Sequence, residues 1–168
     1  MGVEIERKFL LKNEAWKKEV IRSQKIAQGY LSNVKEVEST SSTIRVRVSD
    51  DKAWITVKSN NKGISRSEYE YEIPVLDGQE MLENLCEQKV EKIRHHVMHD
   101  HVHFEIDEFL GENLGLILAE VELPSIDSPH PTPDWLGQEV SDEGRYYNVN
   151  LITNPYSKWL KSKPLNFK

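Results

Sequence analysis

The chain has a single cysteine, no long apolar run and no excess of positive charge. Cys86 alone excludes an intramolecular disulfide and any metal site built from several thiolates, and we expect it to be a buried, inert thiol in a helix. No apolar stretch approaches the roughly 18 residues of a membrane-spanning helix. The net charge of −6 disfavours nucleic acid and anionic membranes as partners.

Charged residues appear within the first six positions, so an apolar leader is not expected. A cytoplasmic protein without a signal peptide is therefore expected. The 168 residues fit one domain with a real core, and we expect a single domain over residues 1–168. Charged residues make up 30% of the chain, but the apolar residues are regularly patterned, so disorder is not expected.

What the chain does have is a series of segments in which apolar and charged residues alternate. The clearest is 3–11, where Glu4, Glu6 and Lys8 share one face, because successive side chains in a strand point to opposite faces. Seven further segments show a similar pattern and are predicted to be strands: 25–31, 43–48, 54–58, 66–73, 89–98, 101–109 and 116–123.

Few segments have helical signals. Asn13 is expected to cap a short helix that ends at Gln24, and Asp77 to cap a second helix that runs to about residue 87. The polar segment 32–42 is expected to be a loop, and the tail beyond the proline-rich segment 124–133 a mixture of loop and helix.

Eight strands with mostly hairpin-length links predict a mainly β (α+β) fold with an antiparallel sheet. A twisted sheet of this size closes into a barrel or splits into two layers, and the pattern alone leaves both open. In either case, the helices would cover part of the outside.

The charged faces carry pairs of like sign. Such pairs repel unless a ligand or a neighbouring strand of opposite sign neutralises them. Acidic pairs suit a divalent cation and basic pairs a polyanion, so the pattern is compatible with a ligand-filled interior. It is equally compatible with a wet outer face of an antiparallel sheet. The pairs are Glu4/Glu6, Arg45/Arg47, Glu68/Glu70/Glu72, Lys92/Arg94, Glu105/Asp107 and Glu120/Glu122.

Five histidines crowd the segment 95–103, a density that suggests a transition-metal site. His99 and His101 flank the expected turn at Asp100, however, and His95 and His96 point to opposite faces. The pattern therefore favours a solvent-exposed hairpin tip over a histidine-ligated metal. The aromatic residues of the tail are expected to pack the tail onto the sheet; they are Trp135, Trp159 and the pair Tyr146-Tyr147.

The motif Glu4-x-Glu6-x-Lys8 is followed by an ordered series of further motifs. They are Gln28-Gly29-Tyr30-Leu31, Arg45-x-Arg47, Thr56-x-Lys58, Arg66-x-Glu68-x-Glu70, Lys92-x-Arg94, Asp107-x-Phe109 and Glu120-x-Glu122. In this order the chain resembles the CYTH superfamily, also called the triphosphate tunnel metalloenzymes. The resemblance implies a closed eight-stranded antiparallel barrel (the tunnel fold) with a few helices packed outside. The charged faces would then point inward.

The resemblance also implies a role for each motif residue. Mg²⁺ or Mn²⁺ would be held by Glu4, Glu6, Glu120 and Glu122, with Glu70 and Asp107 near a second ion. The phosphate groups would be bound by Lys8, Arg45, Arg47, Lys58, Arg66, Lys92, Arg94 and Arg145. Lys8 and Tyr30 would belong to the catalytic group.

The function implied is metal-dependent hydrolysis of inorganic tripolyphosphate to diphosphate and phosphate. Three alternatives stay open at this point: a class IV adenylyl cyclase, a nucleoside or thiamine triphosphatase, and a barrel that binds polyphosphate or nucleotide without turnover. In the second, Trp54 or Trp135 would stack on the organic group. The partner is expected to be a small triphosphate, with no nucleic acid and no membrane, and the protein a monomer or homodimer.

Overall fold

The computed structural model describes residues 2–32, 42–60 and 64–162, and of residues 160–162 only the backbone. The expected loop at 32–42 therefore falls largely outside the described residues. The strands are β1 (Gly2–Leu11), β2 (Val20–Tyr30), β3 (Ser42–Ser49), β4 (Lys52–Ser59), β5 (Ser65–Ile73), β6 (Lys89–His99), β7 (Val102–Phe109), β8 (Ile117–Glu122) and β9 (Leu136–Glu139). The α-helices are α1 (Val75–Asn84), α2 (Asn148–Thr153) and α3 (Tyr156–Ser162), and short 3₁₀ turns are η1 (Ala15–Glu19), η3 (Gly111–Asn113) and η4 (Gly144–Tyr146).

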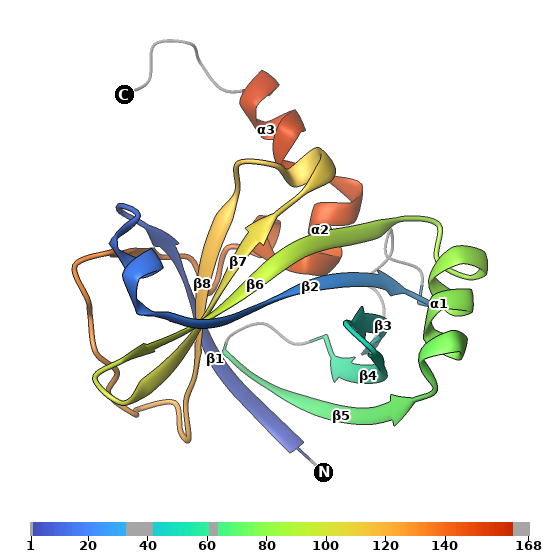
Figure 1. Cartoon of the computed structure of the whole chain (residues 1–168), viewed down its shortest axis with the longest axis horizontal. Helices are drawn as coiled ribbons and strands as arrows, with labels where there is room; N and C mark the ends of the chain where they lie inside the picture. Colours follow the sequence, from blue (N-terminus) through green and yellow to red (C-terminus); the bar gives the residue numbers. More distant parts are fainter. Residues whose placement is uncertain (1, 33–41, 61–63, 163–168) are drawn as a thin grey trace.

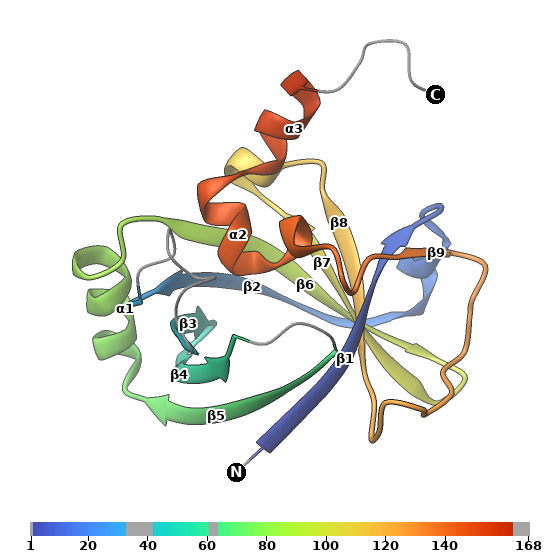
Figure 2. The same ribbon diagram turned by 180° about the vertical axis from the view of Figure 1, so that it is seen from behind.

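Eight strands form a closed antiparallel barrel. Their order is β5-β4-β3-β2-β6-β7-β8-β1, and pairing of β1 with β5 closes the ring. The strands wrap around a central space in Figure 1. The ninth strand, β9, lies outside the ring and pairs with β1, as Figure 2 shows. The closed barrel implied by the resemblance is confirmed, and the sheet does not split into two layers.

The outward faces of the strands are apolar and are covered in two places. Residues of β1, β6, β7 and β8, among them Phe9, Val97 and Phe104, pack with Trp16 and Trp135 from the connecting segments. On the other side, α1 lies beside β3, β4 and β5 in both views. There its Leu82, with the following Cys86, packs on Val46. Cys86 is buried as expected, one residue beyond the C-cap of α1, and burial raises its thiol pKa.

At one end of the barrel, the inward rows also become apolar. Leu10, Val90, Phe109 and Leu118 continue the inward faces of β1, β6, β7 and β8 and pack against the tail. The tail residues are Val140, Tyr146, Leu151, Ile152, Tyr156 and Trp159, which belong to η4, α2, α3 and the segment before them. The tail thus covers this end, and the expected packing of Trp135, Trp159 and Tyr146 is confirmed.

The local pattern was misleading in two places. The helix expected over 13–24 is wrong: only η1 forms, and β2 begins at Val20, where it pairs with Val97 of β6. Long-range pairing overrides the local propensity here. The sequence also gave no indication of β9, a four-residue strand beside Phe9 and Leu11.

Smaller differences concern caps and turns. The predicted helix at 77 begins at Val75 after Pro74, so Asp77 lies in the first turn and makes no side-chain cap. The expected turns at Asp50 and Asp100 are confirmed, and both residues have positive φ. Within the described residues, no helix combines the length and the apolar character needed to cross a membrane.

Glu19 connects η1 to two distant segments. Trp135 Nε1 donates a hydrogen bond to its Oε1 at 2.8 Å, and His99 Nδ1 lies 2.7 Å from its Oε2. Burial works to raise the pKa of Glu19, but the bonds from Trp135 and His99 outweigh it and the pKa is lowered. A lowered native pKa means that this contribution to stability is present above the unfolded value of about 4.3 and is lost as the pH falls.

We expect Glu19→Ala to lower the free energy of unfolding by about 1–3 kcal/mol at neutral pH, because the Trp135 indole N–H loses its acceptor. Urea denaturation measures the change. Glu14→Ala, which removes an exposed pair with Lys17, is the matched control and should cost at most about 1 kcal/mol. Equal losses in the two variants would contradict the role given to Glu19.

Candidate functional site

The barrel encloses a cavity of about 710 Å³. It is lined by charged side chains from β1, β3, β4, β5, β6, β7 and β8, together with residues around η4 and α2. The inward direction of the charged faces is therefore confirmed. All but two of the residues predicted from the sequence line it: Glu4, Glu6, Lys8, Tyr30, Arg45, Arg47, Lys58, Arg66, Glu70, Lys92, Arg94, Glu120 and Glu122.

The two exceptions are Arg145 and Asp107. The Arg145 guanidinium lies over the rings of Tyr146 and Trp159, and its Nη2 donates to the Tyr146 hydroxyl at 3.1 Å. Asp107 is fully buried behind two lining cations rather than at the cavity surface. Their predicted contacts with phosphate and metal stay predictions.

One wall of the cavity is acidic. In the register of β1 and β8, Glu6 lies opposite Glu122 and Lys8 opposite Glu120. Burial and the nearby charge of Glu6 raise the pKa of Glu120 to about 7. A carboxyl group that resists ionisation beside other carboxylates is one that a cation would stabilise in its charged form.

The facing wall is basic and is neutralised in part by carboxylates. Lys58 Nζ lies 3.1 Å from Glu4 and 3.2 Å from Glu68, and Arg47 lies 3.2 Å from Glu70. Burial, with the charges of neighbouring arginines, lowers the pKa of Arg47 to about 10, and burial also lowers that of Lys58. These cations are therefore held close together at an electrostatic cost.

Asp107 holds the next two cations in place. Its oxygens accept hydrogen bonds from Lys92 Nζ at 2.7 Å and from Arg94 Nε and Nη2 at 2.8 Å each. Burial would raise the pKa of Asp107, but the two cations hold it well below its usual range. Burial lowers the pKa of Lys92 to about 8 despite that contact. Lys92 also donates to Asn148 Oδ1 at 2.9 Å.

Lys8 and Tyr30 lie deep in the cavity wall. Lys8 Nζ donates to the carbonyl oxygen of Tyr146 at 3.3 Å and lies 5.5 Å from the centre of the Tyr147 ring. The Tyr30 hydroxyl accepts from Gln28 Nε2 at 3.3 Å, and burial raises its pKa. Both side chains are thus poised at the cavity, with Lys8 only 6% exposed.

Several lining residues were not among the predicted site residues. Glu68 and Glu105 share strand faces with predicted ones, so the two-residue period was a signal for them. Tyr147 contacts the barrel as expected, but from the inside: it lines the cavity, with Lys8 and Arg66 against its ring. No period marks the lining residues of the tail, which are Ser141, Asp142, Gly144, Tyr147, Asn148, Val149 and Asn150.

The histidines divide into two groups. The turn at Asp100 and His101 is the exposed hairpin tip that was expected, and His95 packs against Trp16 on the outside. His96 and His103 instead lie on the inner faces with Glu105. Among the described residues, these three are the one group of possible metal ligands whose donor atoms all lie within 4.8 Å of one another.

The fold and the site together define a closed antiparallel barrel around a cavity lined by opposed carboxylates and cations. A family model described as "CYTH domain" matches residues 2–156. The chain belongs to this family, as its motifs suggested.

Two curated relatives are each named inorganic triphosphatase. The chain is 46% identical to the protein from Acetivibrio thermocellus over 95% of this chain and 99% of that protein. It is 34% identical to the one from Nitrosomonas europaea over 88% and 95%. A solved structure of an inorganic triphosphatase is 33% identical and covers 90% of this chain and 95% of its own, with a TM-score of 0.64.

We expect Asp107→Ala to lower the free energy of unfolding by about 3–5 kcal/mol, because two buried cations lose their shared partner. Urea denaturation measures this. Glu108→Ala is the matched control on the same strand: it removes a half-exposed pair with His95 and should cost about 0–1 kcal/mol. A loss at Asp107 no greater than that of the control would show that Lys92 and Arg94 do not depend on it.

Proposed function

We propose that the protein hydrolyses inorganic tripolyphosphate to diphosphate and phosphate inside the barrel, with the help of a divalent cation. The observation that carries the proposal is the ring of seven lysine and arginine side chains around one cavity. Phosphoryl transfer depends on charge neutralisation and in-line positioning more than on covalent chemistry. The relatives named inorganic triphosphatase support the same reaction.

The charge of the cavity supports the need for a metal ion. Seven lysines and arginines line it, but so do eight aspartates and glutamates, counted among the described residues. The lining alone therefore does not attract a polyanion strongly. A bound divalent cation would convert the acidic wall from a repulsive surface into part of the phosphate site.

The donor set fits Mg²⁺ or Mn²⁺, because these ions prefer hard carboxylate oxygens. We assign the ion to Glu4, Glu6, Glu120 and Glu122 on β1 and β8. Once bound there, it would neutralise phosphate charge and polarise the phosphoryl group under attack. Glu70 is a further candidate ligand, and at present it accepts hydrogen bonds from Arg47 and Thr56.

The basic wall supplies phosphate contacts. The Nε atoms of Arg45 and Arg47 are buried and find no hydrogen-bond acceptor among the described residues. A buried donor without an acceptor is costly, and phosphate oxygens match the planar fork of arginine. These donors favour an anionic ligand with several oxygens. Lys58, Arg66, Lys92 and Arg94 extend the same surface around the cavity.

In this proposal, Asp107 is first a positioning residue, and its contact with a second metal ion stays a prediction. It sets Lys92 and Arg94 in fixed orientations from behind the cavity wall. In the same proposal, Lys8 contacts the reacting phosphate directly, and Tyr30 supports it from a neighbouring position. Arg145 acts through the aromatic residues of the tail.

Among the described residues, neither tryptophan that was expected to stack on an organic triphosphate is placed to do so, and the aromatic rings that line the cavity are those of Tyr30 and Tyr147. Trp135 is 2% exposed and belongs to the outer core, and the Arg47 guanidinium lies 5.3 Å from the centre of the Trp54 ring. Neither tryptophan lines the cavity. This favours inorganic tripolyphosphate over a nucleotide or thiamine ester. A single domain, a cytoplasmic location and a monomeric or homodimeric state remain parts of the proposal.

Incubation of the protein with tripolyphosphate, ATP or thiamine triphosphate, each with Mg²⁺ and with Mn²⁺, tests the function. We expect the fastest phosphate release from tripolyphosphate and none without a metal ion. Glu6→Ala should abolish it, whereas Glu112→Ala, an exposed change in η3, should not. Chromatography of the ATP reaction would reveal cyclic AMP. Faster turnover of ATP, formation of cyclic AMP, or tight binding without phosphate release would each overturn the proposal.

We expect Lys8→Ala to lower kcat by about 10²–10³-fold, the usual cost of removing one group that stabilises developing charge. Steady-state kinetics at saturating tripolyphosphate measures the change. Lys12→Ala, an exposed lysine just beyond the same strand, is the control and should leave kcat unchanged. An unchanged kcat in Lys8→Ala would remove Lys8 from the reacting phosphate.

A further inference from the structure

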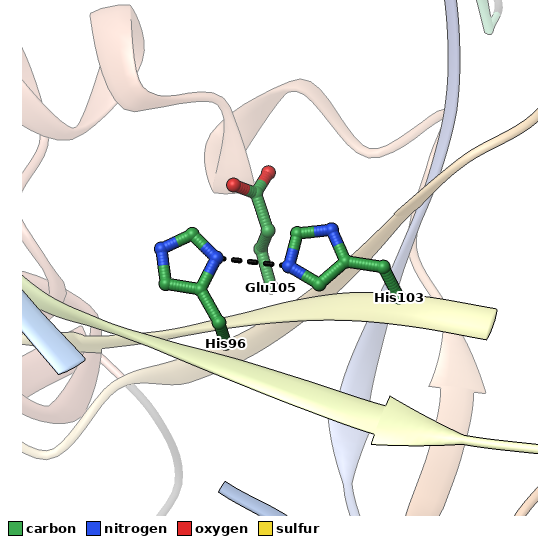
Figure 3. A group of neighbouring side chains, drawn as sticks. All are labelled: His96, His103 and Glu105. Carbon is green, nitrogen blue, oxygen red and sulfur yellow. Dashed lines mark hydrogen bonds between the residues drawn. The ribbon is translucent and has the colours of Figure 1, made fainter. Parts of the chain in front are cut away.

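Three side chains gather on the inner face of the β6–β7 hairpin, at the end of the rows away from the tail. His96 lies opposite Glu105 in the strand register, and His103 lies two residues before Glu105 on the same face. His96 Nδ1 and His103 Nε2 are 2.8 Å apart. Figure 3 shows the two rings edge to edge, with the Glu105 carboxylate between them in this view.

Both nitrogen atoms of His96 have partners, and those of Nε2 lie outside the cluster. His96 Nε2 lies 2.8 Å from Gln24 Oε1 and 3.2 Å from Arg22 Nη2. The shorter contact is to an acceptor, and the Gln24 amide is held because its Nε2 donates to Ser49. We therefore assign the proton of His96 to Nε2, so that Nδ1 accepts a hydrogen bond from His103 Nε2. On metal binding, His103 Nε2 would give up this proton, and the neutral ring would carry its proton on Nδ1 instead. In metal sites, a hydrogen bond from the ring nitrogen that does not bind the metal, like that of His96 Nε2 to Gln24, orients the histidine.

We propose that His96 Nδ1, His103 Nε2 and a Glu105 oxygen form a binding site for a borderline transition-metal ion of the Zn²⁺ or Co²⁺ type. Two imidazoles and one carboxylate suit such an ion better than Mg²⁺. None of the three ligands is among the four carboxylates assigned to β1 and β8, although Glu105 lies opposite Glu120 in the strand register. The site does not depend on the proposed hydrolysis.

The two rings must adjust to accept the ion. Two nitrogen ligands at about 2.0–2.1 Å from a tetrahedral metal lie roughly 3.4 Å apart, so the rings must separate by a fraction of an ångström and turn until both nitrogen lone pairs face the metal. His103 is at the exposed edge and can supply this movement. Glu105 now pairs with Arg94 at 3.2 Å, but Asp107 holds Arg94 through two shorter bonds. Arg94 thus keeps a partner when Glu105 turns to the metal.

Three protein ligands leave a fourth position open, as in zinc sites that bind water or substrate. Glu105 lines the cavity, whereas His96 and His103 are not among its lining residues, so the site borders the cavity on the side of Glu105. Water or an oxygen of an anion in the cavity would complete the coordination.

Titration of the full-length protein with Co²⁺, followed by its visible absorption, tests the site. We expect a visible band typical of nitrogen-ligated Co²⁺ in the unaltered chain. His103→Asn should weaken Co²⁺ binding at least tenfold. His101→Asn is the matched control, because His101 is exposed at the hairpin tip with a φ of 64°, a conformation that asparagine tolerates. This variant should bind Co²⁺ as tightly as the unaltered chain.

Two further variants separate this site from others. Gln24→Leu removes the partner of His96 and should weaken Co²⁺ binding by about 10–100-fold. Glu6→Gln should leave the band intact, because Glu6 belongs to the carboxylate set. The proposal is overturned if no band appears, if His103→Asn binds as tightly as His101→Asn, or if Glu6→Gln abolishes the band. Phosphate release plays no part in this readout, so failure of the hydrolysis proposal is recognised separately.

Discussion

Side-chain alternation along eight paired strands forces the charges of this protein inward. The outward rows carry the apolar residues that α1, η1 and the segment around Trp135 cover, so the opposite rows must face the interior. An interior of this kind is stable only if its charges neutralise one another or a ligand. Lys58 with Glu4, Arg47 with Glu70, and Asp107 with its two cations meet this need. Fold and site are consequences of one pattern.

The neutralisation is uneven around the cavity, and this unevenness prepares it for a ligand. Most lining cations have a carboxylate within 4 Å, yet the Nε atoms of Arg45 and Arg47 lack acceptors among the described residues. On the opposite wall, Glu120 is hard to ionise because it is buried beside Glu6. A metal ion and a polyphosphate added together would satisfy both walls. The metal ion alone would leave the donors of the basic wall without acceptors, and the polyphosphate alone would leave the charge of the acidic wall unneutralised.

The sequence was sufficient to predict which strand residues share the charged faces. It was insufficient to predict which residues of the tail line the cavity. A two-residue period places Glu4, Arg47 and Lys92 on the charged faces of their strands, because strand geometry fixes the direction of each side chain, and the family resemblance indicated that these faces point inward. Tyr147 and Asn148 reach the cavity only because the tail folds across the barrel end, which no local period encodes. The helix expected at 13–24 was wrong for a related reason: the pairing of Val20 with Val97 joins residues far apart in the chain. Asp107 was correctly placed inward, but its depth behind Lys92 depends on neighbouring strands.

One hairpin carries three kinds of chemistry in succession. Along the inner faces of β6 and β7, Val90 and Phe109 pack against the tail, Lys92 and Arg94 bind Asp107, and His96 meets His103 and Glu105. Their order depends on the register set at the turn, where Asp100 and His101 both adopt positive φ. A slip of one residue would turn one strand's row outward and expose its apolar row to the cavity. The tight turn therefore determines where the apolar closure ends, where the cations that line the cavity begin, and which imidazoles can meet.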